Sequence, residues 1–145
     1  MIAIGSDHGG FELKGHIIEH LKEKGIEVKD FGTYSEASVD YPDCAKPVCK
    51  AVLDGECECG ILICGTGIGI SMAANKFKGI RAALCGDVFS AKMSKEHNNA
   101  NVICMGGRVL GRELANMIVD TYLEAKFQGG RHADRIKKIH EIETM

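Results

Sequence analysis

The sequence lacks an excess of charge of either sign, because 18 lysines and arginines nearly balance 20 aspartates and glutamates, for a net charge of -2. It has no basic stripe, which argues against a nucleic-acid partner. It also lacks long apolar runs: its longest are far shorter than the roughly 20 residues that span a bilayer, so no membrane partner is expected. Residues 1–5 carry no lysine or arginine and are interpreted as a first strand, not as a signal peptide.

Cysteine is present but not in the arrangement of a disulfide or metal framework. The seven cysteines are an odd number, scattered through apparent helices and strands, which favours reduced thiols and a cytoplasmic protein. A cluster of four matches no zinc-binding spacing: Cys44, Cys49, Cys57 and Cys59. His16 and His20 lie one helical turn apart, but no third ligand is apparent. The sequence therefore predicts no metal site.

What the chain does contain is a regular alternation of strands and helices. Five segments have the apolar character of strands, at 2–6, 26–31, 60–64, 80–85 and 101–105. Six have helical periodicity, at 11–24, about 43–53, 70–77, 87–95, about 112–126 and 131–142. This alternation predicts an α/β fold, a five-stranded parallel sheet with helices on both faces. No linker is long enough to divide the chain, so residues 1–145 are predicted to form a single domain.

One stretch, residues 60–75, stands out. Its buried-strand pattern ends in three glycines, Gly65, Gly67 and Gly69, before a helix-favouring segment. Glycines let the backbone turn tightly and bring its N–H groups to a ligand, and the following helix points its positive end at the same place. Such a joint stabilises a phosphate or an oxyanion. Cys64 and Thr66 carry a thiol and a hydroxyl to it, and a thiol whose pKa is lowered there can act as a base or a nucleophile.

Several interpretations compete for this loop. A Walker A loop is excluded by the missing lysine after Gly69. A dinucleotide fingerprint needs its third glycine where Ile70 stands, although Asp87 lies at a ribose-binding distance downstream. A tyrosine phosphatase needs an arginine at the same Ile70 position. The alternative without any function is a tight turn beside a buried cysteine that serves only the fold.

Ligands bind parallel sheets at the carboxyl ends of the strands, which selects the polar residues to consider. Asp7 and His8 follow the first strand, and Arg108 follows the fifth, so both segments share a rim with the glycine loop. His97 and Asn98 precede the fifth strand, nominally at the opposite pole, from which a neighbouring subunit could supply them. For His97, a role as a helix C-terminal residue that interacts with the dipole is an equally good interpretation.

Arg131 and Arg135 lie one turn apart on the last helix. They form either a charged helix surface or a two-arginine clamp for a phosphate. Gly129 and Gly130 set this helix off from the rest of the chain.

Five motifs, in order, resemble the type B ribose-5-phosphate isomerases, the family that includes the galactose-6-phosphate isomerase subunits. They are Asp-His-Gly-Gly-Phe-x-Leu-Lys from residue 7, Cys-Gly-Thr-Gly-Ile-Gly-Ile-Ser-Met-Ala-Ala-Asn-Lys from 64, Gly-Ile-Arg-Ala from 79, His-Asn-x-x-Asn-Val from 97 and Gly-Gly-Arg-His from 129. The resemblance covers essentially the whole chain. It implies interconversion of ribose 5-phosphate and ribulose 5-phosphate through an enediolate, without metal or organic cofactor, in a Rossmann-like domain. Some members carry a glutamate base at or near the Ser71 position, and this chain fits the cysteine branch.

The resemblance also implies roles for residues at matching positions. Cys64 would move the proton between C1 and C2, and Thr66 and His97 would assist opening of the furanose ring. The remaining positions would bind substrate. Backbone N–H groups would hold the enediolate oxygens, from Gly65, Thr66, Gly67, Ile68 and Gly69. Asp7 and Asn98 would bind hydroxyls, and four side chains would hold the phosphate: His8, Arg108, Arg131 and Arg135. In this interpretation Asp87 has no part in binding a dinucleotide.

Three alternatives remain open at this point. The substrate could be a 6-phosphohexose such as allose or galactose 6-phosphate; the chain could be a hydrolase with a Cys64–His97 pair; or it could bind a sugar phosphate without turnover. For the assembly we expect a homodimer, or a tetramer, with active sites shared between subunits. In that assembly helix 131–142 packs on a partner through Ile136 and Ile139, and His97 serves the Cys64 of the other chain. The supplier of Arg131 and Arg135 is left open.

Overall fold

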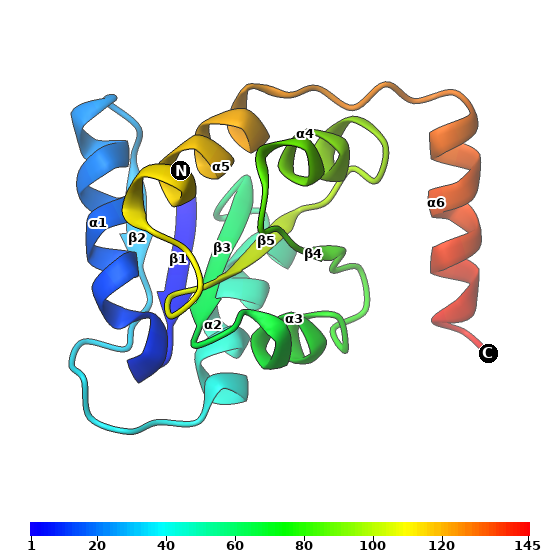
Figure 1. The fold of residues 1–145 in the computed structure, drawn as a ribbon. Coiled ribbons are helices and arrows are strands. Elements are labelled where there is room, and N and C mark those ends of the chain that lie inside the picture. Colours follow the sequence, from blue (N-terminus) through cyan, green and yellow to red (C-terminus); the bar gives the residue numbers. More distant parts are fainter.

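The computed structural model describes all 145 residues and contains one parallel sheet between two layers of helices (Figure 1). The strands are β1 (Ile2–Ser6), β2 (Val28–Asp30), β3 (Cys59–Cys64), β4 (Ala82–Leu84) and β5 (Val102–Gly106). The helices are α1 (Phe11–Glu23), α2 (Tyr41–Leu53), α3 (Ile68–Ala74), α4 (Val88–Glu96), α5 (Arg112–Glu124) and α6 (Arg131–Ile142), with a short 3-10 turn at His8–Gly10. The predicted five-stranded α/β fold is confirmed.

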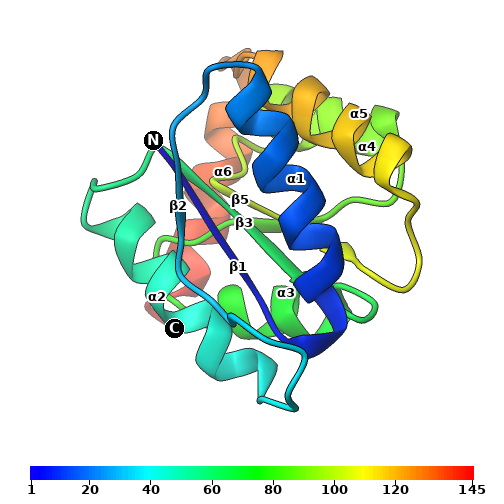
Figure 2. The same cartoon turned by 90° about the vertical axis from the view of Figure 1, so that its left-hand side faces the viewer.

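The sheet has its core on both faces because alternate strand residues point to opposite sides. In β3, Ile61 and Ile63 join the apolar cluster under α1, α4 and α5, whereas Leu62 and Cys64 join the cluster under α2 and α3. Figure 2 shows these two helix layers on either side of the strands. All six residues of β3 are buried, which explains the unbroken apolar run in the sequence.

The strand order is β2-β1-β3-β5-β4, and every neighbouring pair is parallel. After β2, the chain returns to the other side of β1, so a topological switch point lies between β1 and β3. The chain then places β4 at the edge and inserts β5 beside β3. The carboxyl ends of β1, β3 and β5 are therefore neighbours, and the loops that follow them meet.

The element boundaries differ from the sequence prediction mainly at the sheet edges. The two edge strands β2 and β4 have three residues each, shorter than the predicted 26–31 and 80–85, and each pairs with a single neighbouring strand. Helix α2 begins at Tyr41 rather than near residue 43, since Pro42 occupies the first turn, where its missing N–H costs nothing. No helix is long and apolar enough to cross a membrane.

Candidate active site

The three loops at the carboxyl ends of β1, β3 and β5 interlock through their backbones. The Asp7 N–H donates to the Ile63 carbonyl at 3.1 Å, and the Gly107 N–H donates to the Cys64 carbonyl at 2.8 Å. A Cβ on Gly107 would lie 2.5 Å from the Gly9 carbonyl oxygen. Loops this close accept no larger residue at the contact, so the rim that the sequence predicts is a single rigid unit.

Cys64 is the last residue of β3 and is 5% exposed. Its Sγ accepts a hydrogen bond from the Gly67 N–H at 3.1 Å. Gly67 adopts the left-handed conformation, with φ of 80°, and α3 begins at the next residue. The N–H donor and the first turn of α3 both favour negative charge at this point.

Thr66 is exposed at the tip of the same loop, and its Oγ1 accepts a hydrogen bond from the Ile68 N–H at 3.2 Å. Arg108 is tied to the loop as well, because its N–H donates to the Gly65 carbonyl at 3.0 Å. Its guanidinium Nη1 would lie 3.3 Å from a Cβ on Gly65, so the cationic head covers this glycine. A thiol, a hydroxyl and a cation therefore converge on one loop.

Asp7 and His8 complete this group. Asp7 is 6% exposed, and its Oδ1 accepts hydrogen bonds from the N–H groups of Gly9 at 2.9 Å and Gly10 at 3.2 Å. The His8 Nδ1 is 3.2 Å from the Val39 backbone N, whose hydrogen can only be donated. The neutral His8 ring in this arrangement carries its proton on Nε2, which is left to donate to a ligand.

Two residues that the sequence analysis passed over belong to this region. A Cβ on Gly69 would lie 2.6 Å from Cζ of Tyr41, so the half-exposed tyrosine ring packs on the glycine loop. Lys14 is 1% exposed, and its Nζ donates to Asp30 Oδ1 at 2.6 Å and to the Thr33 carbonyl at 2.7 Å.

Lys14 thereby anchors the start of the segment 31–40, whose Val39 reaches His8. The sequence did carry a signal for Lys14. It is a charged residue on the helix face that Leu13, Ile17 and Leu21 mark as buried.

The dinucleotide interpretation of the glycine loop finds no support in the geometry. Asp87, its candidate for the ribose, is the N-cap of α4, where Oδ1 accepts a hydrogen bond from the Ser90 N–H at 2.7 Å and Oδ2 one from the Ser90 hydroxyl at 2.8 Å.

A second group of expected site residues lies at the other end of the sheet. His97 is the C-cap of α4 and Asn98 follows it, both ahead of β5. The His97 ring stacks on that of His132 in α6, with centroids 4.1 Å apart and planes 11° apart. Arg131 and Arg135 are exposed on the same helix. The structure thus forms two clusters, one around Cys64 and one around His97, at opposite ends of parallel strands.

Comparison with known proteins identifies the family of this chain. Residues 2–139 match the family model described as Ribose/Galactose Isomerase. The chain belongs to the ribose/galactose isomerase family. It is 55% identical over 142 residues to ribose-5-phosphate isomerase B of Escherichia coli K12, covering 98% of this chain and 95% of that protein.

Solved structures agree. The structure of Clostridium thermocellum ribose-5-phosphate isomerase B superposes with a TM-score of 0.97 at 59% identity, covering 99% of this chain and 97% of the other. Ribose-5-phosphate isomerase B of Mycoplasma genitalium, solved with bound ribulose-5-phosphate, gives a TM-score of 0.93 at 47% identity, covering 99% and 95%. The type B ribose-5-phosphate isomerase resemblance drawn from the sequence is confirmed.

In this member of the family, α6 is docked on its own chain despite the glycine linker. The Arg81 Nη1 donates to His140 Nε2 at 3.1 Å, and His140 Nδ1 and Glu143 Oε1 are 2.6 Å apart. Glu143 also accepts a hydrogen bond from the Gly79 N–H at 3.0 Å. Ile136, predicted to face a partner, is 9% exposed and is buried on its own chain. On α6, Ile139 and Ile142 remain exposed, at 46% and 64%.

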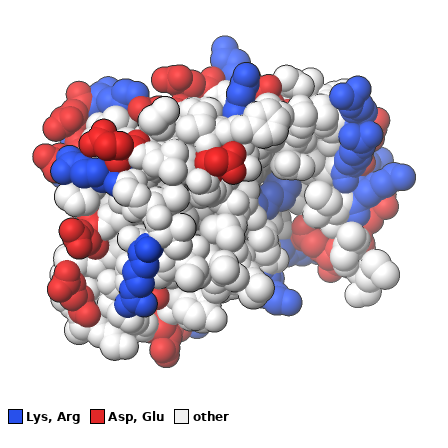
Figure 3. All heavy atoms as spheres, in the orientation of Figure 1, with Lys and Arg blue, Asp and Glu red and all other residues white.

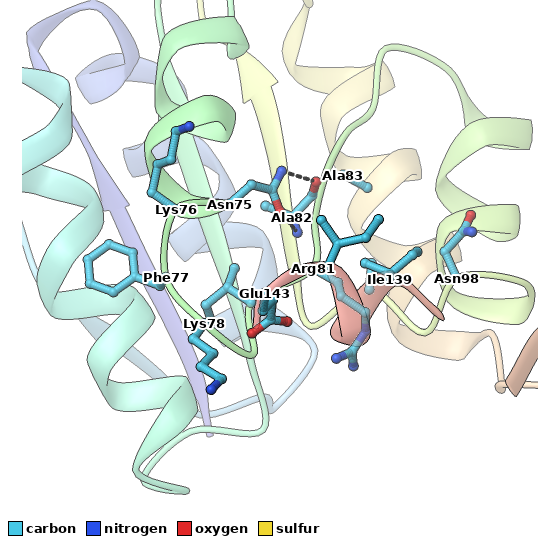
Figure 4. A pocket seen from close by; sticks show the side chains of 13 residues that line it. Asn75, Lys76, Phe77, Lys78, Arg81, Ala82, Ala83, Asn98, Ile139 and Glu143 are labelled. Atoms are coloured by element: carbon cyan, nitrogen blue, oxygen red, sulfur yellow. Dashed lines mark hydrogen bonds between the residues drawn. The ribbon is translucent and has the colours of Figure 1, made fainter. Parts of the chain in front are cut away.

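A cavity of about 640 Å³ lies between the end of α6 and the α3–β4 segment (Figure 4). Arg81 and Ile139 line it from the two sides, and Asn98 is the single expected site residue in its wall. The loop around Cys64 does not open into this cavity, so the cavity and the Cys64 cluster are separate features of the chain.

Proposed function

We propose that this chain is an aldose–ketose isomerase that interconverts ribose 5-phosphate and ribulose 5-phosphate, with Cys64 as the base. The observation that carries the proposal is the position of Cys64, whose thiol ends a buried strand and faces the Gly67 N–H inside a rigid rim. The names of the relatives and the ribulose-5-phosphate held by the Mycoplasma genitalium protein support the choice of substrate.

The reaction needs a base for a carbon-bound proton and donors for the oxygens that become negative. In our proposal Cys64 removes the proton from C2 of the open-chain aldose, and an enediolate forms. The same sulfur returns the proton to C1, while the hydroxyl proton at O2 moves to O1 as the ketone forms. Backbone N–H groups of residues 65–69 would hold the enediolate oxygens, since fixed donors in a water-poor site stabilise charge as it develops.

The other residues fit the two ends of the substrate. Asp7 and Asn98 are proposed to bind sugar hydroxyls. His8, with its Nε2–H free to donate, and the cations Arg108, Arg131 and Arg135 are proposed to bind the phosphate, which accepts several hydrogen bonds at once. Thr66 and His97 are proposed to assist ring opening. These groups are chemically sufficient for the reaction without a metal or an organic cofactor.

The two clusters stand at opposite ends of the sheet, so a complete site requires two chains. We infer a homodimer in which His97 of one protomer completes the site around Cys64 of the other. Arg131 and Arg135 would come from the same protomer as His97, because His132 of α6 stacks on the His97 ring. A Cys64–His97 hydrolase pair within one chain does not form, because Cys64 ends β3 whereas His97 precedes β5, at the opposite end of a parallel sheet.

An exposed apolar surface supports this dimer. Four large apolar side chains from α3, the end of β4 and α4 are 44% to 71% exposed: Ile68, Met72, Leu84 and Phe89. Figure 3 shows an uncharged surface across the centre of this face, between charged side chains at one edge and those of α6. An uncharged, apolar surface beside a site is typical of a subunit interface. Burial of Ile139 by the partner would complete the packing of α6.

The proposed function is tested by incubating the purified protein with ribose 5-phosphate and measuring ketose formation. The expected result is ribulose 5-phosphate at equilibrium with the aldose. Binding of ribose 5-phosphate without ketose formation would contradict the proposal and identify a non-catalytic binder. A parallel assay with allose 6-phosphate and galactose 6-phosphate tests the hexose alternative. The family description names galactose beside ribose, and a hexose needs only more room between the phosphate-binding groups and the base.

The seven cysteines are free thiols, which supports our assignment of the protein to the cytoplasm.

A further inference from the structure

His132 has no part in the site proposed so far, yet it is the most buried residue at the start of α6. It is the second residue of this helix and is 8% exposed, whereas its neighbours Arg131 and Arg135 are exposed. Its ring is parallel to the imidazole of His97, at a centroid distance of 4.1 Å. One face of the His97 ring is therefore covered by another flat ring of the same size.

Hydrogen bonds hold the segment between α5 and α6 against the end of α4, where this stack forms. The Gln128 N–H donates to the Glu96 carbonyl at 3.0 Å, and the Gln128 side-chain amide donates to Glu96 Oε1 at 2.8 Å. Glu96 immediately precedes His97. The His132 N–H then donates to the Gly129 carbonyl at 3.1 Å, which starts the helix with His132 facing inward. The stack is thus determined by contacts on both sides of it.

The surroundings of the stack keep the His132 ring uncharged. Burial, and then the neighbouring His97, Arg131 and Arg135, lower the pKa of His132, so this ring is held neutral. A neutral His132 therefore places no positive charge against the face of the His97 ring.

We propose that His132 is a positioning residue that holds the His97 imidazole in the plane required for opening the furanose ring in the partner's site. The inference rests on the proposed function. In ring opening the C1–O4 bond breaks and its electron pair goes to O4, which takes up a proton, while the C1 hydroxyl loses its proton as the aldehyde forms. His97 handles one of these two protons, and a ring free to rotate would miss the oxygen.

The decisive comparison separates ring opening from the chemistry at C1 and C2. Ribulose 5-phosphate cannot close a furanose ring, because its O5 carries the phosphate. Exchange of its C1 hydrogen with D₂O therefore requires phosphate binding, Cys64 and the enediolate, but no ring opening. Conversion of ribose 5-phosphate requires all of these and ring opening. A defect confined to His97 positioning appears in the second reaction alone.

Two variants change the stack. His132→Leu fills the buried position with an apolar side chain but lacks a flat ring, whereas His132→Phe retains a flat ring. Lys137→Ala, an exposed change on the same helix, is the control. We expect His132→Leu to lower kcat for ribose 5-phosphate by about 10- to 100-fold, the scale of a misplaced catalytic group, with C1 exchange of ribulose 5-phosphate within about twofold of wild type. His132→Phe should recover most of the lost rate.

Equal losses in both reactions would overturn the inference, since they would mean that His132 serves the arginine clamp or the fold. Unchanged conversion in His132→Leu would overturn it as well. If His132→Leu fails to fold by circular dichroism, His132→Phe decides alone, and loss of ribose 5-phosphate conversion in a folded His132→Phe protein contradicts a role for the stack. Failure of the wild-type protein to convert ribose 5-phosphate would instead reject the proposed function.

Discussion

At the scale of single residues, the proposed chemistry depends on one sulfur. Replacing Cys64 by alanine should lower kcat by roughly 10²–10⁴-fold, the usual contribution of a general base. The KM for ribose 5-phosphate should change by less than about threefold, because the thiol acts on a carbon-bound proton and adds little to ground-state binding. Steady-state kinetics measure both. A large rise in KM with an unchanged kcat would assign Cys64 to binding instead.

Alkylation tests the same sulfur without turnover. Burial raises the pKa of Cys49 to about 11, and it also raises the pKa of Cys104 well above its usual value. At about pH 8, only about 0.1% of Cys49 is then a thiolate, the form that reacts. We expect iodoacetamide to modify Cys64 well before these two, as read by peptide mass spectrometry, and bound ribose 5-phosphate to slow that modification. An alkylation rate at Cys64 that does not respond to substrate would place the site elsewhere.

At the scale of elements, the β3–α3 joint depends on the backbone of Gly67. A Cβ there would lie 2.6 Å from a methyl carbon of Leu84 and 2.7 Å from the backbone of Met105, on a residue with positive φ. Gly67→Ala should lower the free energy of unfolding by about 2–4 kcal/mol and abolish activity. The control is Gly15→Ala in α1, where a Cβ meets nothing within 4 Å.

The Gly15→Ala control should raise stability by roughly 0.5–1 kcal/mol, because alanine favours a helix over glycine. Urea denaturation measures both variants against wild type. Equal effects of the two substitutions would mean that the loop tolerates a side chain at position 67 and that its conformation does not depend on glycine.

The attachment of α6 should weaken in acid. Because the pKa of His132 is lowered in the folded protein, the unfolded chain takes up a proton at this residue first as the pH falls. The stability contribution of neutral His132 is therefore complete above about pH 6.5, the ordinary value for histidine, and is lost as the pH falls below it. His132→Phe removes this titration.

We therefore expect the melting temperature of wild type to fall more steeply than that of His132→Phe between about pH 7.5 and pH 5.5. Differential scanning fluorimetry of the two proteins in the same buffers provides the measurement. The histidines that do not touch His132 are the same in both proteins, so their contributions cancel in the comparison. Parallel curves would show that His132 is not held neutral.

At the scale of the whole molecule, the separation of Cys64 and His97 predicts complementation between inactive subunits. Cys64→Ala and His97→Ala proteins are mixed after mild dissociation and reassociated. If each site combines Cys64 of one chain with His97 of the other, random mixing of equal amounts should restore about a quarter of wild-type activity, since half the dimers are mixed and each has one intact site. A mixture that stays inactive would place both residues in one chain's site.

The sequence by itself determined a large part of this protein. Strands, helices and the glycine joint follow from periodicity and from glycine spacing, which are local properties of the chain, and the order of the five motifs was sufficient for the family. The rim of Asp7, Cys64 and Arg108 followed from the rule that parallel strands end at the same edge.

Tertiary structure alone decided which elements became neighbours. The insertion of β5 between β3 and β4, the contact of Tyr41 with Gly69, the burial of Lys14 and Ile136, and the stack of His97 on His132 all join residues far apart in the chain. Such contacts depend on how whole faces pack and on where a loop can reach, and no periodicity encodes them. His132 illustrates the difference: in the sequence it is a polar residue between two arginines, and only the docking of α6 turns its ring onto His97.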